Sequence, residues 1–174
     1  MQNINWPGIM KIKEIQHKDS KGNIIWEAFD IPNLLHLEGE QFLLQAAFTG
    51  GKTSTIIPEY YYLGLDNRLL VSVEDNVSDL LSEPSFAGYQ RAEIASSNDF
   101  AINFEQNHYV ATSPIVAFRA TTGSWGPVSN LFLTAQVNGS YKLLSTAVLP
   151  AAVALDSGES VTMRIGMQIR EYVA

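Results

Sequence analysis

The sequence of 174 residues contains no cysteine. This absence excludes a disulfide framework and any metal site built on thiolates. The sequence also has no apolar run of the roughly 18–20 residues that a membrane-spanning helix needs. Its first residues, MQNINWPGIMKIK, lack the apolar stretch and small-residue cleavage site of a secretory signal. We therefore expect a protein that is made in the cytoplasm and stays there or joins a particle assembled there.

Histidine is scarce, and the three histidines, His17, His36 and His108, lie far apart in the sequence. Their separation does not match the i, i+3 or i, i+4 spacing of common zinc sites. We expect no bound metal and no cofactor.

Motifs of catalysis are also missing. Serine is common, but no Gly-x-Ser-x-Gly motif marks a nucleophile. The pair Gly50-Gly51 belongs to neither of the common glycine patterns that hold phosphate. We expect no catalytic residue and no enzymatic activity. A hydrolase with two unmarked carboxylates, such as Glu83 and Asp99, is the alternative in this class.

Positive charge is limited, since 11 Lys and Arg residues stand against 18 Asp and Glu residues, for a net charge of −7. Nucleic-acid binders usually present a basic surface, so we expect no nucleic-acid partner. The lack of a spanning apolar run leads us to expect no membrane partner. Acidic residues gather at Asp66, Glu74, Asp75, Asp79 and Glu83. Their order does not match a calcium-binding EF-hand loop, so we expect a solvated loop and short helix.

What the sequence has in abundance is the pattern of β-strands. Val161, Met163 and Ile165 begin a run in which apolar and polar residues alternate strictly up to Arg170. A period of two predicts a strand with one buried face. Asn138-Gly139 lies between two apolar runs and predicts a tight hairpin turn. Further strands are expected at 60–65, 89–95, 100–104, 115–120, 129–137 and 141–148.

The amino-terminal half adds one helix and an arm. Strands at 9–17 and 24–29, joined by a polar loop, predict a hairpin arm over residues 1–32. Asn33 is a candidate helix cap, and apolar pairs predict a helix near 35–48 that ends at Gly50-Gly51. A short helix is expected at 75–81. The pattern as a whole favours a mainly β protein, an antiparallel β-sandwich over residues 33–174 with this helix and the arm, and a jelly-roll topology is compatible with it.

Aromatic residues are the candidates for contact with a partner. Trp6 and Trp26 lie in the predicted arm, which is too small to bury them alone. Tyr60 and Tyr62 share one strand face, which favours a core or protomer interface over a sugar-stacking platform. Trp125 lies in the segment FRATTGSWGPVSNLFL, where Gly123, Gly126 and Pro127 indicate a corner between two strands. We expect Trp125 to cap the core edge or touch a neighbour, and ligand stacking is the alternative hypothesis.

Four segments, in this order, resemble a group of tailed-bacteriophage virion proteins. They are KDSKGNIIWEAFDIPNLLHLEGEQFLL, YYYLGLDN, EPSFAGYQRAEI and FRATTGSWGPVSNLFL. The resemblance covers about residues 18–137. The chain departs from the group at Asp75-Asn76, where the group often has Asp-Thr, and it has no evident receptor-binding tip.

The resemblance implies a structural component of the virion without enzymatic activity. On this basis we expect a protein of the virion, assembled in the host cytoplasm, that binds major capsid, tail or portal subunits as a homo-oligomer or in many copies. A capsid-associated decoration or auxiliary role is favoured, because the sequence has no coiled coil and no fibre repeat. The alternatives are a tail-associated structural protein and a carbohydrate-binding module of a phage fibre that uses Tyr60, Tyr62 or Trp125.

Overall fold

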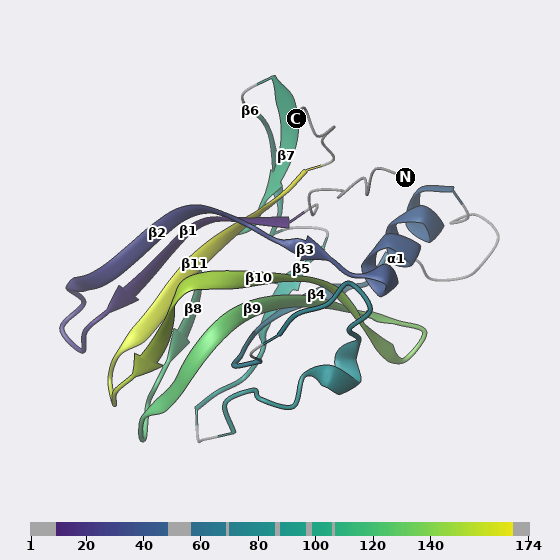
Figure 1. The fold of residues 1–174 in the computed structure, drawn as a ribbon. Coiled ribbons are helices and arrows are strands. Elements are labelled where there is room, and N and C mark those ends of the chain that lie inside the picture. The colour runs from purple at the N-terminus through teal and green to yellow at the C-terminus, as the bar shows by residue number, and fades with distance from the viewer. Residues whose placement is uncertain are drawn as a thin grey trace.

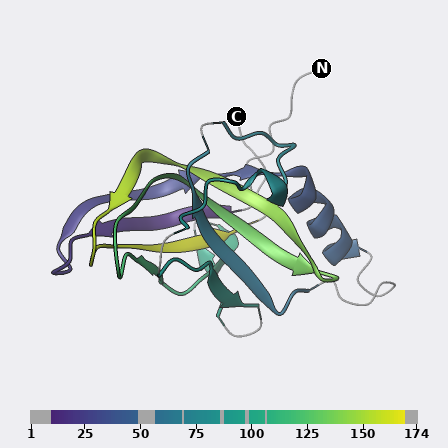
Figure 2. The same ribbon diagram turned by 90° about the horizontal axis from the view of Figure 1, so that it is seen from below.

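The computed structural model describes residues 10–48, 57–68, 70–85, 88–96, 99–105 and 107–168. These residues form two antiparallel sheets that pack face to face, with one α-helix at one end of the molecule (Figures 1 and 2). The predicted antiparallel β-sandwich with one helix in its amino-terminal half is therefore confirmed.

The first sheet places strands from both ends of the chain side by side. Within the described residues its order is β2-β1-β11-β7-β6, and β8 pairs with another stretch of β11. The strands are β1 (Met10–Lys18), β2 (Ile24–Pro32), β6 (Ala101–Glu105), β7 (His108–Thr112), β8 (Val116–Arg119) and β11 (Ser160–Met167). The sequence did not predict β7.

The second sheet is built on a long hairpin and has the order β3-β10-β9-β4-β5. Its strands are β3 (Leu34–Leu35), β4 (Tyr60–Asp66), β5 (Ala92–Ala95), β9 (Trp125–Val137) and β10 (Ser140–Leu155). Asn138 and Gly139 join β9 to β10 with φ angles of 51° and 79°. A type I′ turn needs positive φ at both positions, so the predicted Asn-Gly hairpin is confirmed.

The core lies between the two sheets. Val161, Met163 and Ile165 of β11 are buried, as their alternation predicts, and Ile169 lies outside the described residues. Leu131 and Leu133 of β9 face them from the other sheet as members of the same apolar cluster. Burial of a large aliphatic side chain contributes about 1.5–3 kcal/mol, so this layer is a main source of stability.

The amino-terminal hairpin is part of the sandwich, which corrects the prediction of a separate arm. In the described part of that arm, residues 10–32, β1 lies between β2 and β11. It buries Met10, Ile12 and Ile15 in the core. The register shifts between Ile12 and Glu14, a bulge that moves the buried face by one residue. This bulge explains why the alternation of β1 was hard to see in the sequence.

The helix α1 (Leu37–Phe48) confirms the helix predicted near 35–48. It begins later than Asn33 because Leu34 and Leu35 pair with β10 as strand β3. The helix approaches β10 closely at Gly39, where an added Cβ would lie 2.2 Å from the carbonyl oxygen of Leu144. In both ribbon views α1 lies at the end opposite the β1–β2 turn (Figures 1 and 2).

The segment between β4 and β5 covers the outer face of the second sheet. It contains the 3₁₀ helix Val77–Asp79, capped by Asn76, where the sequence predicts a short helix. Leu80 from this segment packs with Phe132 and Leu143 in a second apolar cluster. None of the described helices is long and apolar enough to cross a membrane.

Candidate functional site

A groove of about 570 Å³ opens between the two sheets at the α1 end of the sandwich. Its walls come from α1, the β6–β7 hairpin and the last residues of β11. Apolar side chains dominate the lining, among them Met10, Phe42, Leu133, Leu144 and Met167. Binding pockets of roughly 300–1,000 Å³ with mostly apolar walls are typical of ligand and anchor-residue sites. This groove has the size and the chemistry to receive a large apolar group.

The β6–β7 hairpin forms the outer wall of this groove. The register pairs Ile102 with Ala111 and Phe104 with Tyr109, so these four side chains share one face of the hairpin. Ile102, Phe104 and Tyr109 are 73%, 63% and 69% exposed, and the Phe104 and Tyr109 rings lie 5.1 Å apart. Three large apolar side chains therefore stand in solvent beside an apolar groove.

The hairpin is exposed because the sheet supports only its base. Among the described residues, β7 pairs with β11 only through Thr112 and Ala111, opposite Gly166 and Met167. The outer part of the hairpin extends beyond the end of the sheet, as Figure 1 shows. We call the groove and the apolar face formed by Ile102, Phe104, Tyr109 and Ala111 the open end of the sandwich.

Two polar groups of the groove, those of Ser145 and Tyr61, are directed to or buried among apolar atoms. The Ser145 hydroxyl donates to the Met10 sulfur at 3.4 Å. Burial raises the pKa of the Tyr61 phenol, which keeps it uncharged. Within the part of the chain that the structure describes, no three His, Asp or Glu side chains gather closely enough to hold a metal ion. The open end is thus suited to apolar contact.

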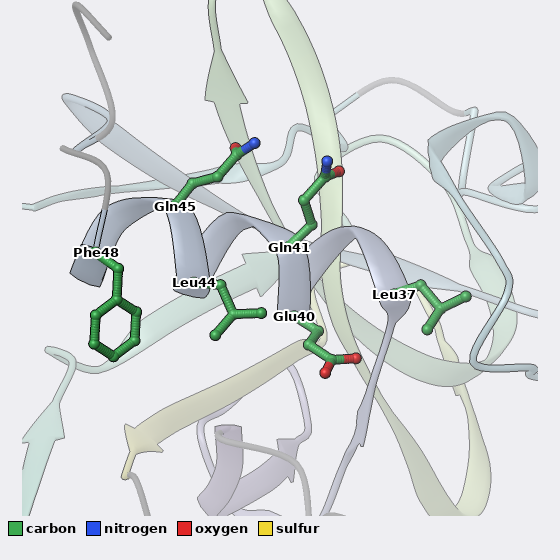
Figure 3. Close-up of a pocket in the computed structure, with 6 residues that line it drawn as sticks. All are labelled: Leu37, Glu40, Gln41, Leu44, Gln45 and Phe48. Atoms are coloured by element: carbon green, nitrogen blue, oxygen red, sulfur yellow. The ribbon is translucent and has the colours of Figure 1, made fainter. Parts of the chain in front are cut away.

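A second exposed apolar surface runs along the outside of α1. Leu37, Leu44 and Phe48 are exposed and border a shallow hollow of about 380 Å³ together with Glu40 and two glutamines (Figure 3). Leu44, Phe48 and Glu40 point to the same side of the helix, whereas the glutamines point to the other (Figure 3). The outer face of α1 extends the apolar surface of this end of the molecule.

Trp125 lies at the opposite end and is buried. It is the first residue of β9, pairs with Leu155 of β10 and is only 3% exposed. The Tyr89 ring meets it edge-on at 5.4 Å and stacks at 6.0 Å on Phe118. The prediction of a sandwich corner is confirmed, and the side chain caps the core edge. Because its ring is covered within the chain, this burial argues against the hypotheses that Trp125 stacks on a ligand or touches a neighbour.

The other aromatic candidates lie in different places. Tyr62 lies on the outer face of the second sheet, with its ring 5.3 Å from that of Tyr141, and Tyr60 shares this side of β4. Trp26 of β2 is half-buried against the core cluster. Trp6 lies outside the described residues. The structure therefore does not bring Trp26, the tyrosines and Trp125 together into one site.

Three of the acidic residues predicted to lie in a solvated loop are instead ion-paired. Arg68 binds buried Asp66 at 2.5 Å and Asp75 at 2.9 Å. Glu83 binds Arg91 and accepts a hydrogen bond from the Tyr89 hydroxyl. The Asp66 pair ties Arg68 to β4, and the other two pairs join residues between β4 and β5 to each other, so charge alone was misleading about the exposure of these carboxylates.

His36 completes this network as a neutral side chain. Its Nδ1 lies 2.9 Å from the carbonyl oxygen of Ser72, which can only accept, so Nδ1 carries the proton. Its Nε2 then accepts from the Thr146 hydroxyl at 2.8 Å, and that hydroxyl accepts from Arg68 at 3.1 Å. Burial lowers the pKa of His36, which agrees with this neutral state.

The open end was missed in the sequence although its strand was predicted. The predicted strand 100–104 contains Ile102 and Phe104, but alternation does not tell which face of a strand is covered. The sequence did not reveal that this strand pairs with β7, and this pairing places the hairpin at the edge of the sheet.

Comparison with protein-family models, curated proteins and solved structures found no match to this chain.

Proposed function

We propose that this chain is a non-enzymatic structural protein of a virion, in which it binds neighbouring protein subunits. Two independent arguments support the proposal. The resemblance of four sequence segments to tailed-bacteriophage virion proteins supports the virion, and the open end supports a role in protein binding. The observation that carries the binding role is the exposed apolar face of the β6–β7 hairpin beside the groove.

Such a face is costly for a protein that stays alone. Large contiguous apolar patches on soluble proteins mark interaction sites. Removing apolar surface from water contributes about 25 cal/mol of stabilising free energy for each Å², and an exposed patch lacks this contribution. The hairpin face is continuous with the groove through Ile102 and Tyr109, which line both. A neighbouring subunit that inserts an apolar side chain into the groove would bury apolar surface of the groove and of the hairpin face at once.

Within the virion we favour a capsid-associated auxiliary or decoration protein over a tail-associated one. The described chain is a single short sandwich, with neither a coiled coil nor a fibre repeat. The carbohydrate-binding alternative is weakened, because burial of Trp125 leaves it with only Tyr60 and Tyr62 as stacking residues.

The proposal is tested on purified virions of the phage that encodes the chain. Quantitative mass spectrometry of separated capsid and tail fractions should find the chain in many copies per capsid. Enrichment in the tail fraction would instead favour the tail-associated alternative. Absence of the chain from intact particles would refute the virion role.

A further inference from the structure

The strand edges of the two sheets differ in how well they are protected from pairing with another chain. β2 carries Glu27, a left-handed residue at Asp30 (φ 56°) and Pro32 at its end. Charge, local distortion and proline are the devices by which proteins block an edge. In the second sheet β3 has two residues, and the last N–H of β5, at Ala95, donates to the Asp99 carboxylate at 2.7 Å. These three edges are short or protected.

The edge of β6 has none of these devices. Its sequence, Ala101-Ile102-Asn103-Phe104-Glu105, contains neither lysine nor proline. Its one charged side chain, Glu105, accepts from the Lys13 ammonium at 2.6 Å, so its charge is compensated within the chain. On the side away from β7, no strand of the described residues pairs with β6.

The register identifies which backbone groups are open. β6 ends at Glu105 and β7 begins at His108, so the connection has two residues and closes on the pair Glu105–His108. Two-residue hairpins of this kind close on a hydrogen-bonded pair, and such pairs alternate along the ladder. The backbone groups of Asn103 therefore face β7, whereas those of Ile102 and Phe104 face outward.

We propose that β6 of one copy pairs antiparallel with β6 of a second copy about a two-fold axis at Asn103. In this register Ile102 of each copy lies opposite Phe104 of the other, and their outward N–H and C=O groups form the new ladder. Ala101 lies opposite Glu105 of the second copy, so no like charges meet. The occupant of this edge is a second copy of the chain because the five-residue sequence is complementary to itself in this register.

The pairing joins the two open ends. Residues 102 and 104 have the same parity, so their side chains from both copies lie on one face of the four-stranded sheet that results. The apolar faces of both hairpins become one surface that leads from one groove to the other. The inference rests on the proposed function, since it names the second copy as one of the neighbours that the chain binds.

The pairing is expected to be weak in the isolated protein. Three large side chains at the observed exposure can bury roughly 300–400 Å² in each copy. A standard interface buries about 800 Å² for each partner. The pair should therefore be reversible in solution and gain strength from further contacts in an assembly.

Engineered cysteines test the register directly, because the natural chain has none. In the proposed dimer Asn103 of one copy lies opposite Asn103 of the other, as a non-hydrogen-bonded pair. The two Cα atoms of such a pair lie about 4.5 Å apart, which a disulfide can bridge. The full-length N103C variant should form a covalent dimer under mild oxidation. The matched control A101C should not, since its two cysteines would lie about 13 Å apart. A mixture of A101C and E105C should crosslink.

Failure of N103C to crosslink, or equal crosslinking of N103C and A101C, would overturn the proposal. Each variant is first shown to retain the unfolding transition of the parent, so a negative result is not a folding defect. Sedimentation velocity gives a second reading: concentration-dependent dimers should disappear in Phe104→Lys and persist in Leu81→Lys, a change at an exposed leucine elsewhere. Loss of dimers in both variants, or in neither, would overturn the proposal.

The outcome is separable from that of the proposed function. Crosslinking is measured on the isolated protein, whereas the virion role is measured as copy number in particles. A dimer with this register in a chain that particles lack would retain the pairing and refute the virion role. A chain that is abundant in particles but does not form this crosslink would refute the pairing and retain the virion role.

Discussion

The two ends of the sandwich use aromatic side chains in opposite ways. At the closed end, Trp125, Tyr89 and Phe118 pack against one another and seal the space between the sheets. At the open end, Phe104 and Tyr109 also contact each other, but both stand in solvent beside an apolar groove. The same residue types thus stabilise the fold at one end and remain free to contact a partner at the other.

The largest expected effect comes from emptying the closed end. Trp125→Ala removes a side chain that is 3% exposed and leaves a cavity between the sheets. Truncation of a buried aromatic residue costs about 3–5 kcal/mol of the free energy of unfolding. Urea denaturation measures this loss. A loss below about 1 kcal/mol would show that the corner does not seal the core as described.

A smaller loss of unfolding free energy is expected where α1 packs against β10 beside the open end. In Gly39→Ala the new methyl group would meet the Leu144 carbonyl oxygen, so α1 must move away from β10. Overpacking of this kind costs about 1–3 kcal/mol of unfolding free energy, although alanine favours helices more than glycine does. Thermal and urea unfolding check the prediction. A gain in stability would mean that α1 is not held against β10 at this point.

The stability should also depend on pH through His36, whose backbone N–H donates to the Leu144 carbonyl oxygen just before α1. Burial lowers the pKa of His36 in the folded chain, whereas in the unfolded chain it stays near 6.5. Below about pH 6.5 the unfolded chain therefore binds more protons, and stability falls as the pH drops until the folded-state pKa is passed. Urea unfolding from pH 7.5 to 5 measures this slope.

His36→Gln provides the control for that slope. The variant should be less stable at pH 7.5, because it changes the hydrogen bonds to Ser72 and Thr146. Its stability should then change less between pH 7.5 and 5 than that of the parent. An unchanged slope would assign the pH dependence to other groups.

The smallest effect on stability is expected on the hairpin face. Phe104→Lys changes a side chain that is 63% exposed, and surface changes away from special features usually alter stability by less than about 0.5 kcal/mol. A loss above about 2 kcal/mol would show that Phe104 belongs to the core of the fold. The contrast with Trp125→Ala is the sharpest energetic difference between the two ends.

Strong local patterns predicted the fold well. The alternation of β11, the Asn138-Gly139 turn and the apolar pairs of α1 each carry their own physical signal. The amino-terminal hairpin was misjudged because the bulge between Ile12 and Glu14 disturbs its period. A local irregularity thus hid a strand that lies inside the sheet.

The site was less predictable than the fold. A tryptophan between two glycines suggested a contact residue, whereas Trp125 pairs with Leu155, thirty positions further along the chain. Phe104 is exposed because its hairpin extends past the sheet, and this depends on how β7 and β11 pair. Exposure of both side chains is set by long-range pairing, which residue spacing does not reveal.

The central claim is that the open end binds the neighbouring subunits of a virion. The direct test is rebinding of purified chain to particles that were assembled without it. Wild-type protein and Leu81→Lys should bind to the same occupancy, whereas Phe104→Lys, equally well folded, should bind much less. Equal binding of Phe104→Lys and wild-type protein would contradict the claim.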